Sequence, residues 1–342
     1  MRATTDHRDG QIRIAATARY VPPAQVRPEP PVQAPAAMFP SMREAVMQSV
    51  YADTLRWRDE ATLCATPDFS LEFAQPATPT RVAHERQLTL SDMASTVAME
   101  AIRQCPAQDN RAPDQIIVCA SSFEHDLSLS CAGRLHSELG STGVPFAIGQ
   151  LEGVSFSLAL QLVADMMAGD ERMRTALIVA AERWLPPFSR HGATAAALAD
   201  GAAAVLLTRR AGPGWCVRSV MVCTPATQTA PRDTFVDEAC LVNVVRKTCA
   251  QAGLKPASLD WIVPARINAS LARKISARAG LPAGRTWSPD PADIGYLCAA
   301  DAPAQLDALL RSAPGADGQR ILLWSAGFQG QAGCAILEFR GS

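Results

Sequence analysis

The sequence lacks an excess of charge of either sign. Its 342 residues contain 32 Lys and Arg and 33 Asp and Glu, which gives a formal net charge of −1. Proteins that bind nucleic acid or anionic membranes by electrostatics carry a basic surface, so this balance gives no reason to expect either partner. A hydrophobic content of 48% is enough for one large domain or two packed halves with a sizeable core.

Long apolar runs and paired cysteines are also missing. No stretch approaches the roughly 20 apolar residues of a membrane-spanning helix, and the polar N-terminal segment has no apolar stretch typical of a signal peptide. The ten cysteines occur singly, without a CxxC pair or a Cys and His cluster at zinc spacing. We therefore expect buried thiols in a reducing compartment, no metal site, and a cytoplasmic protein.

Apolar strands and amphipathic helices alternate along most of the chain. The segments IIVCAS (116–121) and TALIVAA (175–181) are typical of strands buried on both faces. The segment from Leu90 to Cys105 has apolar residues at helical spacing, with Ser91 as the expected N-cap. This alternation predicts an α/β protein.

The second part of the chain roughly repeats the order of elements in the first part. Before residue 211 we expect strands and helices ending in the strand 202–208, with helices near Met42–Trp57 and over Leu127–Leu139. After it we expect helices over 234–251 and 269–279 among further strands. This order predicts an N-terminal half over residues 11–210 and a C-terminal half over 211–342. The first half contains an irregular insertion at about residues 27–88, which begins rich in Pro and Ala.

A strand, a sharp turn and a long apolar helix follow one another in PFAIGQLEGVSFSLALQLVADMMAGD (145–170). The turn presents Glu152 at the N-terminus of the helix, where unsatisfied amides and the helix dipole favour an anion. The helix, expected over 153–168, has small or apolar residues on nearly all sides, which predicts deep burial.

Six segments together resemble β-ketoacyl-ACP synthase III, a family of condensing enzymes with the thiolase fold. They are IRIAATARYVPPAQV, DQIIVCASSFEHDLSLSCAGRLHSELG, FAIGQLEGVSFSLALQLVADMMAGD, ALADGAAAVLL, WIVPARIN and AGFQGQAGCAILEF. The resemblance runs from about residue 12 to the end and is weakest over 27–88. It implies a thiolase-like fold, with two pseudo-duplicated βαβαβ-type halves packed in layers.

The catalytic positions that the resemblance implies all depart from the family pattern. Family members hold an acyl group on a cysteine and condense it with a malonyl thioester, with help from a histidine and an asparagine. Here Glu152 stands for the cysteine, Ala265 in VPARIN for the histidine and Tyr296 in GYLCAA for the asparagine. Asn268 of the histidine motif is kept, and Ser128 replaces the bulky aromatic residue that guards the acyl tunnel in many members.

Small errors of alignment do not restore the missing groups. No cysteine lies between Cys131 and Cys216, and no histidine follows His191. Covalent catalysis needs an activated nucleophile, and the usual one is missing together with its partners. The three changes indicate either loss of condensation or different chemistry.

Glu152 has two interpretations. It is either a carboxylate base that activates water, a hydroxyl or an amine against a bound acyl thioester, or a capping carboxylate in a decayed site. Burial would raise its pKa and the helix N-terminus would lower it, so the sequence does not fix the direction. Decarboxylating ketosynthases carry glutamine at the nucleophile position, but making Gln150 equivalent needs a two-residue shift that spoils the flanking match.

Other candidate residues lie on loops that the resemblance places around the site. Cys298 is either a displaced nucleophile at a helix N-terminus or an inert small residue. His125, on the loop that reaches across the dimer axis, and His191 are either bases or solvated side chains. His191 precedes Asp200-Gly201, which we expect to be a structural tight turn. Gly327 is our preferred oxyanion donor in the C-terminal glycine loop.

Two functions follow from the resemblance. One is a ketosynthase-III-like protein of a fatty-acid or polyketide-type secondary-metabolite pathway, which binds acyl-CoA or acyl-ACP and acts as a Glu-dependent acyltransferase, thioester hydrolase or decarboxylase. The other is a catalytically silent subunit that completes an active ketosynthase paralogue through the Phe123–Leu139 region. Both imply a homodimer or a heterodimer, and no cofactor other than the CoA or phosphopantetheine of the substrate.

Overall fold

The computed structural model describes residues 12–26, 81–105, 112–124, 129–184, 190, 197–225, 236–267, 269–287 and 294–341. Most of the predicted insertion, including the helix expected near Met42–Trp57, lies outside these residues. The end of the insertion that is described contains strand β3 (Arg81–Ala83), which pairs with β2 (Ala24–Val26) in a small separate sheet.

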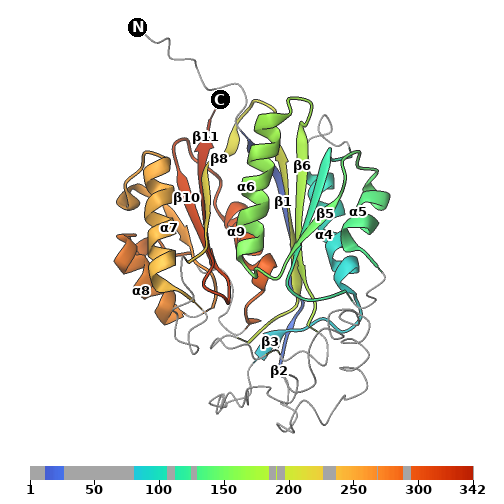
Figure 1. Cartoon of the computed structure of the whole chain (residues 1–342), viewed down its shortest axis with the longest axis horizontal. Coiled ribbons are helices and arrows are strands. Elements are labelled where there is room, and N and C mark those ends of the chain that lie inside the picture. The colour runs from blue at the N-terminus through green and yellow to red at the C-terminus, as the bar shows by residue number, and fades with distance from the viewer. Residues whose placement is uncertain are drawn as a thin grey trace, which may run out of the picture.

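A nine-stranded sheet organises the described part of the chain, in the order β5-β4-β6-β7-β1-β8-β11-β10-β9 (Figure 1). Strands β4, β6 and β7 coincide with apolar segments that are almost fully buried, as expected of strands buried on both faces. The strands are β1 (Arg13–Tyr20), β4 (Gln115–Ala120), β5 (Phe146–Gly149), β6 (Thr175–Glu182), β7 (Gly201–Thr208), β8 (Gly214–Cys223), β9 (Trp261–Val263), β10 (Arg320–Ala326) and β11 (Ala332–Arg340).

The pairing pattern repeats outward from the middle of the sheet. From the centre, one half runs β1, β7, β6, β4 and the other runs β8, β11, β10, β9. In each half the first two pairings are antiparallel and the third is parallel. This repetition confirms the expected architecture of two pseudo-duplicated halves. The exact boundary at residue 210 falls in the connection between β7 and β8 and stays a prediction.

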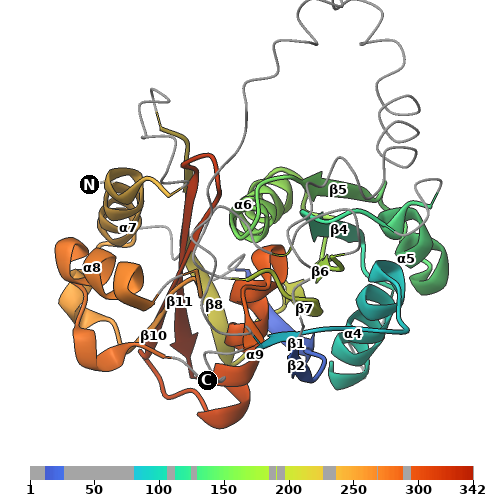
Figure 2. The same cartoon turned by 90° about the horizontal axis from the view of Figure 1, so that it is seen from below.

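Helices form three layers around the two halves of the sheet (Figure 2). Helices α4 (Leu90–Gln104) and α5 (Cys131–Leu139) cover the outer face of the first half, and α7 (Glu238–Gln251) and α8 (Ala269–Ala279) cover that of the second. Between the halves lie α6 (Val154–Gly169) and α9 (Asp301–Ser312), which share one apolar core with strands of both. The start of α6 is therefore held at the junction of the two halves.

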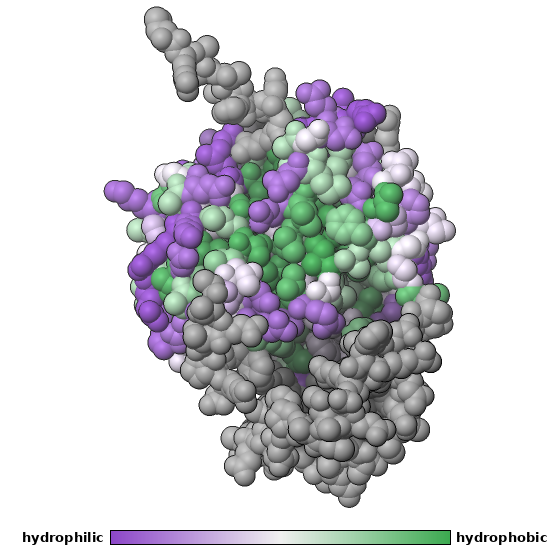
Figure 3. Space-filling view, in the orientation of Figure 1, coloured by the Kyte–Doolittle hydropathy of each residue, from purple (hydrophilic) through white to green (hydrophobic). Residues whose placement is uncertain are grey.

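Helix α6 is buried all round only in its first turn, so the expectation of burial along the whole helix is partly wrong. Phe156 and Leu160 face inward and are each 2% exposed, whereas Leu158, Leu162 and Met166 are half-buried. Figure 3 shows apolar residues gathered on the face of the molecule over α6. The apolar character of this helix thus serves both the core and an outward face.

The N-terminus of α4 is set by a capping box rather than by Ser91. The helix begins at Leu90, and the Thr89 hydroxyl accepts a hydrogen bond from the Asp92 amide at 3.1 Å. In return the Thr89 amide donates to the Asp92 carboxylate at 2.9 Å. The prediction that Ser91 caps this helix is wrong, because Ser91 lies in the first turn and donates to Glu124.

Two other helices start later than the sequence predicts, again where a side chain caps them. Within the described residues, the helix expected from 234 begins at Glu238, and the Asp237 carboxylate accepts from the Cys240 amide at 2.9 Å. The helix expected from 127 begins at Cys131, after the N-cap Ser130. In both helices, a short polar side chain at the N-cap determines where the helix begins, and the apolar periodicity does not.

Gly333 in β11 allows α6 to pack closely on the sheet. A Cβ at this position would lie 2.5 Å from Ser157 Oγ and 2.8 Å from Ser325 Oγ, and these buried hydroxyls are themselves hydrogen bonded at 3.0 Å. We expect Gly333→Ala to lower the free energy of unfolding by about 1–3 kcal/mol through overpacking, as measured by urea denaturation. Gly284→Ala is the matched control, because its Cβ meets nothing within 4 Å. Equal stability of the two variants would contradict this account.

Candidate functional site

The connection between β5 and α6 is a backbone turn of unusual conformation. The non-glycine residues with positive φ in the described part of the chain are Gln150 (60°), Glu152 (45°) and Cys298 (43°). Left-handed backbone is unfavourable for residues with a Cβ and tends to persist where function or packing requires it. The contacts of Gly153 join these segments, since a Cβ on Gly153 would lie 3.5 Å from the carbonyl oxygen of Cys298.

Glu152 projects from this turn toward the loop between β10 and β11. Its Oε2 accepts a hydrogen bond from the Phe328 amide at 2.9 Å, and the residue is half-buried. Burial raises the pKa of the Glu152 carboxyl above its ordinary value, and the Phe328 amide lowers it by less. The direction that the sequence left open is therefore upward, because desolvation outweighs the hydrogen bond.

The amide that faces Glu152 belongs to Phe328 and not to Gly327, our preferred oxyanion donor from the sequence. The Gly327 amide donates instead to the Gln331 carbonyl at 2.8 Å, which closes the turn between the two strands. Gly327 still borders the site, because a Cβ there would lie 3.4 Å from Glu152 Oε2. In this loop the amide that donates to the Glu152 carboxylate is therefore that of Phe328.

Tyr296 occupies the interior next to the turn. Its hydroxyl accepts from the Gly153 amide at 3.2 Å and donates to the Ala326 carbonyl at 3.2 Å. The side chain is fully buried and its ring lies 6.2 Å from the Phe328 ring, centroid to centroid. Burial raises the pKa of the Tyr296 hydroxyl well above its ordinary value, so it stays protonated. Tyr296 therefore bridges the start of α6 and the end of β10.

Ala265 lies in the same apolar cluster as Tyr296. It is 3% exposed and packs in a core that also contains Cys298, Trp324 and Ala326. The fold thus brings the three positions singled out by the resemblance, Glu152, Ala265 and Tyr296, into one region of the molecule. Ala265 and Tyr296, which the resemblance matches to the family's histidine and asparagine, offer a methyl group and a phenol whose hydrogen bonds are already made; this equivalence stays a prediction.

Cys298 does not have the surroundings of a nucleophile. It is fully buried, and burial together with the carboxylates of Glu182, Glu152 and Asp301 raises the pKa of its thiol well above the ordinary value. Of the two interpretations of Cys298, this burial supports the inert small residue over the displaced nucleophile.

Four candidate residues lie outside the described residues. They are His125, Ser128, His191 and Asn268. Their roles as base, tunnel residue or substrate contact therefore stay predictions.

Sequence reasoning missed Glu182, the last residue of β6. Its carboxylate is fully buried and accepts from the amides of Ser121, Ser122 and Ala299 at 2.9, 2.8 and 3.1 Å. Burial raises the pKa of Glu182 to about 7, although these hydrogen bonds oppose the shift. The signal in the sequence was a glutamate at the end of the otherwise apolar strand TALIVAAE.

Asp200, which the sequence suggested to be structural, anchors a second buried network. Its carboxylate accepts from Arg183 Nη1 at 2.9 Å and from Arg190 Nη2 at 2.7 Å, and His84 Nδ1 lies 3.1 Å away. The Trp184 amide donates to the other carboxylate oxygen at 2.8 Å. The network connects the end of β6 with the residues after β3, which supports a structural role.

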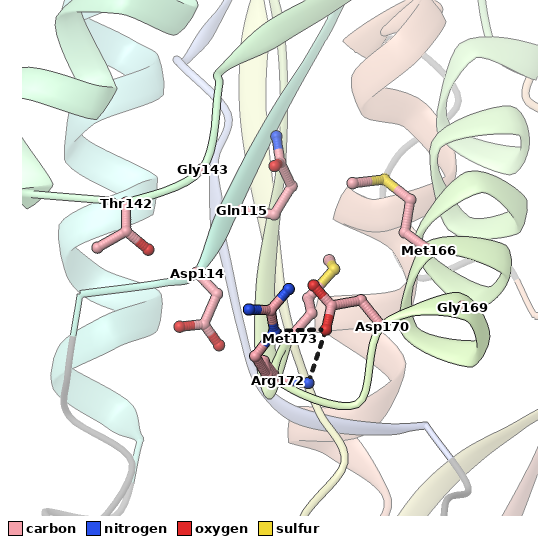
Figure 4. Close-up of a pocket in the computed structure, with 9 residues that line it drawn as sticks. All are labelled: Asp114, Gln115, Thr142, Gly143, Met166, Gly169, Asp170, Arg172 and Met173. Carbon is pink, nitrogen blue, oxygen red and sulfur yellow. Dashed lines mark hydrogen bonds and ion pairs between the residues drawn. The ribbon is translucent and has the colours of Figure 1, made fainter.

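A cavity of about 380 Å³ lies at the opposite end of α6 from Glu152 (Figure 4). A helix of 16 residues is about 24 Å long, so this cavity is not part of the candidate site. Its rim carries the exposed pair Arg172 and Asp170, 3.3 Å apart. The lining residues are Asp114, Gln115, Thr142, Gly143, Met166, Gly169, Asp170, Arg172 and Met173.

The described residues contain neither a helix that could span a membrane nor a cluster of metal-binding side chains. None of their helices has the length and hydropathy needed to cross a membrane. The same residues contain no group of three or more His, Cys, Asp or Glu side chains arranged to hold a metal ion.

Comparisons with known proteins agree with this geometry. Residues 249–339 match the family described as 3-oxoacyl-[acyl-carrier-protein] synthase III C terminal. The structure is similar to that of ChlB3, an acyltransferase, with 19% identity, 97% of this chain and 98% of that chain covered, and a TM-score of 0.69. It is also similar to FabH, a 3-oxoacyl-(acyl carrier protein) synthase III from Pseudomonas aeruginosa (18% identity, 96% and 98% covered, TM-score 0.66). Cerulenin-bound OleA from Xanthomonas campestris is a third similar structure, with 15% identity, 96% of this chain and 99% of that chain covered, and a TM-score of 0.67.

The resemblance to β-ketoacyl-ACP synthase III is confirmed. The fold is that of these thiolase-like enzymes over nearly the whole chain, and the C-terminal segment matches the family itself. The chain thus has the fold of ketosynthase III enzymes, and its C-terminal segment matches the C-terminal model of that family.

Removing the Tyr296 hydroxyl should destabilise the protein. Tyr296→Phe leaves the Gly153 amide and the Ala326 carbonyl buried without their partner, which should lower the free energy of unfolding by about 1–3 kcal/mol in urea denaturation. Ser258→Ala, which removes an exposed hydroxyl bonded to Lys255, should change it by less than about 0.5 kcal/mol. Similar values for both variants would show that the Tyr296 hydroxyl is not a structural link.

Glu182 should make stability fall as the pH rises. Its folded pKa of about 7 exceeds the ordinary value of 4.5, so the stability it contributes is present below about pH 4.5 and is lost as the pH rises through 7. The Glu182→Gln variant cannot ionise there, so wild type should lose up to about 3 kcal/mol relative to it between about pH 4.5 and about pH 8. Urea denaturation of both proteins across this range measures the difference. A constant difference would mean that the carboxylate has an ordinary pKa.

Proposed function

We propose that this protein binds acyl-CoA or acyl-ACP thioesters and transfers the acyl group to a hydroxyl or amine acceptor, or to water, with Glu152 as the base. The reaction forms no carbon–carbon bond and no acyl-enzyme. The observation that carries this proposal is the half-buried Glu152 carboxylate, presented on a left-handed turn and oriented by the Phe328 amide at 2.9 Å. The reaction would take place in the cytoplasm, in a secondary-metabolite pathway of fatty-acid or polyketide type.

The surroundings of Glu152 suit a base. Phe328 holds Oε2, while Oε1 makes no hydrogen bond with any residue in the described part of the chain. Burial raises the pKa of the carboxyl toward the range in which a general base works best at neutral pH. In the proposed step, Oε1 takes the proton from the acceptor O–H or N–H as the acceptor attacks the thioester carbonyl carbon. The C–S bond breaks, and the leaving thiolate then receives that proton.

The partner residues argue against condensation and against decarboxylation. Both reactions need groups that stabilise the charge developing on a malonyl unit. Ala265 offers only a methyl group, and the Tyr296 hydroxyl already serves Gly153 and Ala326. Of the activities that Glu152 can support, acyl transfer and hydrolysis therefore fit better, and the acyltransferase ChlB3, with the same fold, supports this choice.

A silent subunit is the second candidate, and one observation favours it. Phe123, Leu129 and Val144 are 49%, 54% and 81% exposed, close in sequence to the strands β4 and β5. Strand β5 is at one edge of the nine-stranded sheet, and the outward face of α6 is apolar as well (Figure 3). Exposed apolar surface beside an open strand edge is typical of a protein interface. An active paralogue, or a second copy of this chain, would bind through the Phe123–Leu139 region.

Intact-protein mass spectrometry with thioester analysis tests the proposed reaction. Wild type, Glu152→Gln and Glu152→Ala are incubated with a panel of acyl-CoAs, acyl-ACPs and malonyl-CoA. Glutamine can still accept from the Phe328 amide but cannot take a proton, so we expect its rate of thioester loss to fall by about a hundredfold or more. Glu171→Gln changes the same charge at the far end of α6 and should keep the wild-type rate.

Two results would contradict the proposal in different ways. A stable acyl adduct on Glu152 would show covalent catalysis instead of general-base catalysis. Absence of turnover from every form would support the silent subunit, and purification with ketosynthase paralogues would then be expected to yield a heterodimer.

A further inference from the structure

We infer that this site selects acyl groups that carry no carboxylate next to the thioester, and that it rejects malonyl-type substrates. This inference rests on the proposed function, because it names the class of thioester that the same site takes. Two residues would determine the selection: Glu152 through its charge and Tyr296 through the space and the hydrogen bonds that it occupies.

Carboxylates surround the start of α6 from three segments. Glu152 is on the turn itself, and Glu182 Oε1 accepts from the Ala299 amide at 3.1 Å, next to Cys298. Asp301 follows in the same segment, and its charge is compensated by Arg266, whose Nε lies 2.7 Å from Oδ1. Arg266 Nε is thus already paired with a protein carboxylate. The local charge left to meet a substrate is that of Glu152 and of Glu182.

A malonyl carboxylate could not avoid the charge of Glu152. In a malonyl thioester the carboxylate carbon is separated from the thioester carbonyl carbon by one methylene group. If the carbonyl lies within reach of Glu152, the second carboxylate lies within roughly 6 Å of the Glu152 carboxylate, where like charges in a partly desolvated site repel strongly. An acetyl thioester, which lacks the second carboxylate, does not experience this repulsion.

The groups that would offset this repulsion are occupied or absent. The Tyr296 hydroxyl gives its proton to the Ala326 carbonyl, and the Gly153 amide donates to Tyr296. The Tyr296 hydroxyl also lies against the backbone of Gly153, since a Cβ on Gly153 would lie 2.6 Å from the hydroxyl oxygen. Ala265, 3% exposed, adds only an apolar surface. A charged group here would have to be buried without a partner, which is strongly unfavourable.

Equilibrium binding separates this inference from the question of activity. Dissociation constants of acetyl-CoA and malonyl-CoA are measured at low ionic strength for wild type and Glu152→Gln, with Glu171→Gln as the matched control for net charge. We expect wild type and Glu171→Gln to bind acetyl-CoA at least about tenfold more tightly than malonyl-CoA. In Glu152→Gln this ratio should fall to about threefold or less. Glu152→Ala also removes the charge and should show the same reduced ratio. It serves as the second variant in case Glu152→Gln folds poorly.

The possible outcomes are distinct for the two proposals. Equal affinities in wild type, or a ratio that Glu152→Gln leaves unchanged, would overturn the inference, while turnover of acetyl-CoA would leave the proposed function standing. Failure of wild type to bind or turn over any acyl thioester would overturn the proposed function, and the inference with it. A reduced ratio in Glu171→Gln as well would trace the discrimination to net charge and overturn the role of Glu152.

Discussion

The buried carboxylate of Glu182 fixes where three separate segments of the chain meet. It accepts amide hydrogen bonds from the segment after β4 and from the segment that leads into α9, and it is itself the last residue of β6. A carboxylate in this position satisfies backbone donors that would otherwise be buried without a partner. The segment that carries Tyr296 and Cys298 is thereby held against the first half of the sheet, and the start of α6 against both.

The hydrogen bonds around Glu152 make the site largely self-satisfied. The Glu152 carboxylate takes the Phe328 amide, and the Tyr296 hydroxyl links the Gly153 amide to the Ala326 carbonyl. Within the described part of the chain, Glu152 Oε1 is left without a hydrogen bond and is therefore open to a substrate. This arrangement supports the proposals that Glu152 acts as a base and that the site disfavours a second carboxylate on the substrate.

The sequence predicts the fold well because most strands are apolar runs. The turn before α6 is also recognisable, since it lies between a short strand and a long apolar helix. Boundaries such as the start of α4 were less predictable, since they depend on the reciprocal bonds of Thr89 and Asp92. The site was predictable only in part. Glu152, Ala265 and Tyr296 follow from the resemblance, whereas the donor role of Phe328 depends on the local path of the loop, where the Gly327 amide turns toward Gln331. The burial of Glu182 could not be read from one strand in isolation.

The left-handed turn at Gln150 and Glu152 has a mechanical consequence. No glycine supplies these two conformations, so they are held by side-chain contacts: Gln150 donates to the Ser121 carbonyl at 2.9 Å, and Glu152 accepts from Phe328. The second of these contacts joins residues from opposite halves of the sheet. A ligand that draws the Glu152 carboxylate away from Phe328 would therefore free the β10–β11 loop and the first turn of α6 together. Binding of a ligand at Glu152 would therefore change the conformation of segments in both halves of the molecule.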